Sequence, residues 1–376
     1  MVRLGLSTLI FSLAGIPVLA EPQRYQPVLT DDPAETWFVL KARNEGDVSK
    51  KLELLNLYQK EYPNGKSLPW VLSELYECFI ELKQPEKALE VGERLLALDP
   101  TDLALVHRNL KIAEDANNPD LIRRWADRTT ELARLVLSAS PPLGTDATGW
   151  RAKVELARQL VAYTDYLAYI EVFKLTDLRQ KIRWLEEFPS RHPDSSYLPR
   201  VLELHFQALR SIGDQRSALP LAERLIKADP SNEDALLFVA ETLFQQDTDP
   251  ERVMVLCSRL IDLMADKPKP EAVTDAGWSR KKARYAGRAH WMMGKIQVDR
   301  AHWAQGDRSL RAALASLRGV DNLTAAILLH LGWTNYKLGN LQDARKFNEQ
   351  CLAYKSPFQE LAAKNLVAIQ REQPGK

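Results

Sequence analysis

The chain has 376 residues, 45% of them hydrophobic and 27% charged, with a formal net charge of +1. This composition is ample for a large core and lies in the usual range of globular domains. The three cysteines, Cys78, Cys257 and Cys351, give an odd count without metal-ligand spacing, so we expect small buried thiols and neither a disulfide nor a metal site.

The first twenty residues are typical of a secretory signal peptide. Arg3 precedes an apolar run over residues 4–13, and Ala20 ends a small-residue cleavage site before Glu21. We therefore expect export, with the mature chain periplasmic or secreted and free of a transmembrane span. The alternative is an uncleaved anchor, which the short apolar run disfavours.

Helical periodicity dominates the rest of the chain. In residues 86–98, for example, Ala88, Leu89, Gly92 and Leu95 follow the spacing of one buried helical stripe. Turn residues separate such segments, and no sustained alternation of period two indicates a strand. The sequence therefore predicts an all-α fold.

The predicted helices fall into three blocks after a Pro-containing leader at 21–33. In the first block, 34–139, they span 34–45, 48–61, 68–82, 85–98, 102–115 and 119–138. In the second, 149–267, they span 149–174, 177–188, 197–212, 215–228, 232–246 and 250–265. In the third, 277–372, they span 277–305, 307–318, 322–338, 341–354 and 358–371.

The sequence also repeats itself. The stretch EKALEVGERLLALDP, which begins at Glu86, is closely similar to RSALPLAERLIKADP, which begins at Arg216, and the match extends back to Tyr62 and His192. The offset is about 130 positions. Long-period repetition marks a stacked helical array, which usually works by presenting a curved surface to a partner.

The spacing inside these segments resembles the tetratricopeptide (TPR) repeat, a helical hairpin of about 34 residues. The best match is LGWTNYKLGNLQDA, in which Leu331-Gly332, Tyr336, Gly339-Asn340 and Ala344 occupy the family's Leu-Gly, aromatic, turn and Ala positions. The resemblance implies a TPR-like helical-hairpin solenoid and a protein-binding role. The family's carboxylate clamp of Lys and Asn is absent from the corresponding positions, which argues against a chaperone-tail receptor.

Catalytic and cofactor motifs are not evident. The six histidines are scattered, and no HExxH pair, GxSxG elbow or phosphate-binding GxxxxGK[ST] loop occurs. His290, between Ala289 and Trp291, is better interpreted as a core or interface histidine. We therefore predict no catalytic residue, no cofactor and no enzyme activity.

Charge distinguishes the blocks. The net charge is −4 for 32–139, −3 for 149–267 and +10 for 277–376. The helix that opens the third block carries a stripe of one aromatic and four cations at helical spacing, namely Lys281, Arg284, Arg288, Trp291 and Lys295.

We expect this stripe to bind an anionic envelope component or an acidic protein face. The opposite face of the helix is expected to meet the core through Ala283, Ala286, His290, Met293 and Gln297. Nucleic acid is not an expected partner of an exported chain. Two alternatives remain open: the stripe is a solvated face, or it is an internal seam that pairs with the acidic blocks.

The C-terminal repeat adds Trp333, Tyr336 and Lys337 as candidate contacts for an apolar peptide. The alternative is that Trp333 and Tyr336 pack against the next hairpin. Together these features predict a non-enzymatic scaffold or adaptor of the bacterial cell envelope. The rival hypotheses are an enzyme with its site in the concavity of the solenoid and a purely structural spacer.

Overall fold

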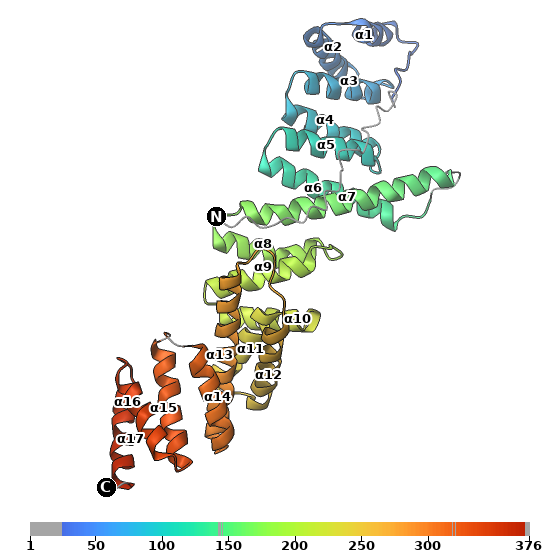
Figure 1. Cartoon of the computed structure of the whole chain (residues 1–376). Coiled ribbons are helices and arrows are strands. Elements are labelled where there is room, and N and C mark those ends of the chain that lie inside the picture. Colours follow the sequence, from blue (N-terminus) through green and yellow to red (C-terminus); the bar gives the residue numbers. More distant parts are fainter. Residues whose placement is uncertain (1–24, 142–143, 145, 318, 320, 373–376) are drawn as a thin grey trace. The chain divides into compact units, whose positions relative to one another are not determined.

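The computed structural model describes residues 25–372 apart from 142, 143, 145, 318 and 320 (Figure 1). The described residues form seventeen α-helices and no strand, which confirms the all-α prediction. The predicted signal peptide and the start of the leader lie outside the described residues.

The chain divides into two compact units. The N-terminal unit comprises the described residues up to Leu198, and the C-terminal unit those from Pro199. The N-terminal unit contains α1 (Pro33–Asn44), α2 (Val48–Glu61), α3 (Leu68–Glu81), α4 (Pro85–Leu98), α5 (Leu103–Asp115), α6 (Pro119–Ser138), α7 (Ala147–Lys174) and α8 (Leu178–Arg191). The C-terminal unit contains α9 (Leu198–Ser211), α10 (Gln215–Ala228), α11 (Glu233–Gln245), α12 (Pro250–Asp266), α13 (Asp275–Asp299), α14 (Trp303–Ser316), α15 (Asp321–Lys337), α16 (Leu341–Leu352) and α17 (Gln359–Glu372).

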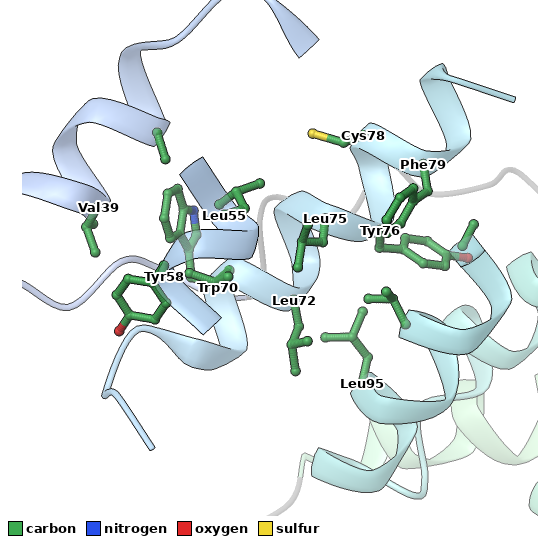
Figure 2. Close-up of a cluster of buried hydrophobic side chains, with 14 residues drawn as sticks. Val39, Leu55, Tyr58, Trp70, Leu72, Leu75, Tyr76, Cys78, Phe79 and Leu95 are labelled. Atoms are coloured by element: carbon green, nitrogen blue, oxygen red, sulfur yellow. The ribbon is translucent and has the colours of Figure 1, made fainter. Parts of the chain in front are cut away.

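Within each unit, most helices that follow one another in the chain pack side by side, as Figure 1 shows. Each helix therefore buries its apolar stripe against its chain neighbours rather than in one central core. Figure 2 shows such a layer, in which Trp70 and Tyr76 of α3 meet Leu55 and Tyr58 of α2 and Leu95 of α4. Burial of large apolar side chains contributes about 1.5–3 kcal/mol each, so nearest-neighbour stacking supports the fold.

The sequence repeat is a structural repeat. Helices α2, α3, α4 and α5 recur as α8, α9, α10 and α11, each beginning 130 positions later. Helix α2 is capped by Asp47 and α8 by Asp177, and in each case the carboxylate accepts a backbone N–H of the first turn. An N-cap of this kind contributes about 1 kcal/mol, and its recurrence fixes the helix starts.

The division into units differs from the three predicted blocks, since it falls within the second block. The predicted boundaries were the two long loops, but the helices on either side of each loop pack on each other. Leu132 of α6 and Leu160 of α7 belong to one buried cluster across the first loop. Across the second, Lys282 of α13 donates a hydrogen bond to the carbonyl oxygen of Ala265 in α12, at 3.0 Å.

One predicted helix boundary, the end of the helix over 277–305, was wrong. The segment predicted as a single helix over 277–305 ends at Asp299, and α14 begins at Trp303. The chain turns at Ala301, which has a positive φ of 59°, and the backbone N–H of His302 donates to the carbonyl of Gln297 at 2.8 Å. The three cysteines are buried, as predicted.

Candidate partner-binding surface

The predicted aromatic residues of the C-terminal repeat form an open cluster on α15. The rings of Trp333 and Tyr336 stack with centroids 5.7 Å apart, and the Nζ atom of Lys337 lies 4.6 Å from the Trp333 ring centre. The Trp333 side chain is 37% exposed. Lys337 is exposed and has no carboxylate partner among the residues that the structure describes. An exposed indole beside an unpaired cation can hold an apolar side chain next to an acidic one.

Helix α17 holds this cluster in place. The Tyr336 hydroxyl donates a hydrogen bond to the Glu372 carboxylate of α17. This hydrogen bond to the carboxylate raises the pKa of Tyr336 above its ordinary value. Helix α17 therefore fixes the Tyr336 ring, while the Trp333 side chain remains partly exposed.

The basic stripe of α13 faces α11 at its beginning. Lys281 Nζ donates to Glu233 and Asp234 of α11, each at 2.9 Å, and the Tyr285 hydroxyl also donates to Asp234. Burial lowers the pKa of Lys281, but the two carboxylates outweigh it and the net shift is upward. Burial, with Asp234 beside it, raises the pKa of Tyr285 to about 12.

The next cations of the stripe are also paired within the chain. Arg288 Nε lies 2.5 Å from a carboxylate oxygen of Glu241 in α11, and Lys295 pairs with Asp299 one turn along its own helix. Burial raises the pKa of Glu241 although Arg288 and Arg284 lie near it. Arg284 alone of the four stripe cations is exposed and has no ion pair among the described residues.

The fifth stripe residue, Trp291, is half-buried. Its ring centroid lies 5.4 Å from that of His330 and 6.5 Å from that of Phe244, and it packs against the buried cluster of α13–α17. It therefore contributes to packing between helices. The structure thus places most of the stripe in an internal seam, one of the alternatives that the sequence left open.

The predicted core face of α13 was wrong. Ala283 is exposed, and Ala286, His290, Met293 and Gln297 are only half-buried. The buried positions of α13 instead lie on both sides of the basic stripe, with Tyr285, Ala289, Met292 and Ile296 on one side and Gly287, Gly294 and Val298 on the other. The apolar residues on the predicted core face did not reveal this error, because a long helix packed between two neighbouring helices buries parts of both of its faces. His290 is half-buried, and burial lowers its pKa, as expected of a core histidine.

Sequence reasoning missed a hollow of about 600 Å³ in the N-terminal unit. It is lined by Asp127, Glu131, Arg134 and Leu135 of α6 and by Arg191 and His192 at the end of α8. The Nδ1 atom of His192 lies 2.7 Å from Oδ1 of Asp165 in α7, and both side chains are buried. Ser138 also lines the hollow, but its hydroxyl donates to the carbonyl oxygen of Leu135 at 3.1 Å, so it is not bonded to the histidine.

A sequence model of the tetratricopeptide repeat family matches residues 204–251, which run from α9 into α12. No curated protein sequence matches the chain. None of the described helices combines the length and apolarity that a bilayer crossing requires.

Several solved structures of TPR proteins are similar at low sequence identity. A thermophilic TPR protein of Thermus thermophilus is 17% identical with a TM-score of 0.27, over 57% of this chain and 98% of that one. The TPR domain of P58(IPK) is 11% identical with a TM-score of 0.31, over 90% and 88%. The C-terminal part of a TPR repeat-containing protein from Cytophaga hutchinsonii is 14% identical with a TM-score of 0.32, over 78% and 99%. With the family match and the tandem helical hairpins, the chain is TPR-like, as the sequence predicted.

Proposed function

We propose that this chain is a non-enzymatic scaffold of the bacterial cell envelope that binds a protein partner through Trp333, Tyr336 and Lys337. TPR repeats usually mediate protein binding. The observation that carries the proposal is that Trp333 is exposed and that Lys337 has no ion pair among the described residues. An exposed indole and an unpaired ammonium lie side by side on α15, whereas most other predicted contact residues are engaged inside the chain.

The chemistry of the cluster indicates the kind of partner. Trp333 offers a partly exposed indole, and Lys337 places a positive charge over its ring. A peptide that carries an apolar side chain next to Asp or Glu would satisfy both groups at once. Arg284, exposed on α13, is the remaining stripe residue that can add attraction to an anionic partner.

The chain contains a matched control for this site. In the N-terminal unit, Trp37 is 51% exposed and Lys41 Nζ lies 4.5 Å from its ring centre. Both pairs have the same spacing of four residues on a helix, and they differ in the stacked tyrosine, which only Trp333 has.

The test is affinity capture from native envelope extract with wild type, Trp333→Ala, Lys337→Glu and Trp37→Ala. We expect one partner to be retained by wild type and Trp37→Ala and lost from the other two variants. Titration of that purified partner should then show at least about a tenfold loss for Trp333→Ala, as expected of a central aromatic contact. Equal binding by all four proteins would refute the assignment of this site.

The envelope location rests on the signal-like residues 1–20, which lie outside the described residues. N-terminal sequencing of the chain from a periplasmic fraction should give Glu21 as the first residue. Recovery of the chain only with Met1 intact and only in the membrane fraction would contradict export by cleavage.

A further inference from the structure

The hollow of the N-terminal unit is built from one face of α6. Asp127, Glu131, Arg134 and Ser138 follow one another at helical spacings of three and four, and the end of α8 closes the opposite side. A volume of about 600 Å³ lies within the range of sites that hold small ligands or a few residues of a peptide.

Two of the four charged groups in the hollow are already paired. Glu131 accepts a hydrogen bond from Arg128 at 2.7 Å, and Arg191 donates to Glu187 at 3.0 Å. Asp127 and Arg134 have no ion-pair partner among the described residues. Next to Arg134 on the helix lies Leu135, which is 50% exposed. The hollow therefore offers one negative group, one positive group and an apolar patch.

His192 adds a polar group of fixed orientation. It is only 5% exposed, and its Nδ1 is bound to the buried Asp165. An ionised carboxylate can only accept hydrogen bonds, so Nδ1 carries the proton that is shared with Asp165. The other ring nitrogen, Nε2, has no partner among the described residues. It remains available for a ligand, such as a peptide backbone N–H.

We propose that this hollow binds an extended peptide segment that carries a basic and an acidic side chain about three residues apart. Asp127 and Arg134 are seven positions apart on one helix, which places their Cα atoms about 10 Å apart along its axis. An extended peptide covers that distance in about three residues. The basic side chain pairs with Asp127, the acidic one pairs with Arg134, and the apolar part of the peptide lies against Leu135.

The site extends the proposed protein-binding function to a second surface. It lies in the N-terminal unit, whereas Trp333 lies in the C-terminal unit, so the two proposals fail independently. Trp333→Ala should leave binding at the hollow unchanged.

The test uses three blocked tetrapeptides, Lys-Ala-Ala-Glu, Lys-Ala-Ala-Lys and Glu-Ala-Ala-Glu, titrated against wild type, Asp127→Lys and Arg134→Glu. Wild type should prefer the mixed peptide, Arg134→Glu the dibasic one and Asp127→Lys the diacidic one. Each preference is expected to be about two- to fivefold, as for partly exposed ion pairs. Because a switch of preference requires folded protein, unfolding of a variant cannot imitate it.

The location of binding is read from histidine side-chain NMR signals. The mixed peptide should shift the imidazole resonances of His192 and leave those of His107, which contacts Tyr163 in the same unit, unchanged. Equal shifts at both histidines, or the same peptide preference in all three proteins, would overturn the proposal.

Discussion

The Nδ1 atom of His192 lies 2.7 Å from Oδ1 of Asp165, and both side chains are buried. In the first copy of the repeat, 130 positions earlier, Glu35 replaces Asp165, and its carboxylate accepts a hydrogen bond from the Tyr58 hydroxyl at 2.6 Å. The position of Tyr58 is occupied by Phe188 in the second copy, which has no hydroxyl to donate. The carboxylate instead meets His192, one helical turn further on.

The His192–Asp165 pair predicts a local stability effect. Asp165→Ala leaves a buried imidazole nitrogen without its partner, so we expect the free energy of unfolding of the N-terminal unit to fall by about 1–3 kcal/mol. Denaturant unfolding measures this change. Asp194→Ala, which removes an exposed carboxylate near the same turn, is the control and should have little effect. Equal losses in both variants would contradict a structural role for the pair.

The C-terminal unit is expected to lose stability in acid through His330. Burial, with Lys295 nearby, lowers the pKa of His330 from 6.5 to about 4, against an opposing effect of Asp299. The unfolded chain therefore binds more protons than the folded one between these two values. The stabilisation is complete above pH 6.5 and is lost as the pH falls towards 4. The shift corresponds to at most about 3 kcal/mol.

Thermal melts of wild type and His330→Gln at neutral pH and at pH near 4.5 would check this. The melting temperature of the variant should fall less on acidification than that of wild type. His290, whose pKa is also lowered by burial, should leave the variant some remaining acid sensitivity. His302→Gln, a change at an exposed histidine, should behave as wild type. An identical acid response in all three proteins would contradict the burial argument.

Local sequence signals predicted most helix positions. Amphipathic spacing and capping residues such as Asp47 and Asp177 act within a few residues of the helix that they define. These local signals do not identify the helix against which a given helix packs. The stripe of Lys281 and Arg288 has the pattern of a solvent-exposed face, and the carboxylates that neutralise it lie on α11, more than forty positions earlier in the chain.

Of the two candidate sites, the cluster on α15 could be predicted from local sequence and the hollow of the N-terminal unit could not. The Trp333, Tyr336 and Lys337 cluster was predictable because its members are neighbours on one helix. The hollow was not, because it needs α6 and the end of α8 to lie beside the same part of α7. The sequence repeat did contain a partial signal for the His192–Asp165 pair. Tyr58, which donates to Glu35 in the first copy, is replaced by Phe188 in the second, so the corresponding carboxylate of Asp165 needs another partner.

The α11–α13 seam predicts that charge reversal within the stripe depends on position. Arg288→Glu places a second carboxylate against Glu241 and should lower the free energy of unfolding of the C-terminal unit by about 1–3 kcal/mol. Arg284→Glu changes an exposed side chain without an ion pair and should cost about 0–1 kcal/mol. Denaturant unfolding of the two variants compares them directly. If Arg284→Glu were as damaging as Arg288→Glu, the distinction between seam and open face would be wrong.

The repeat predicts matched packing defects in the two units. Ala88 of α4 and Ala218 of α10 lie 130 positions apart, and both are 0% exposed at the small site where neighbouring helices meet. A tryptophan at either site overpacks its layer, which typically costs about 1–3 kcal/mol. Because helices contact mainly their chain neighbours, Ala88→Trp should raise amide hydrogen exchange first in the N-terminal unit, and Ala218→Trp first in the C-terminal unit. Ala97→Trp, at an exposed position of α4, should change neither. A uniform rise across both units in either variant would show that the array unfolds as one cooperative body, contrary to stacking by nearest neighbours.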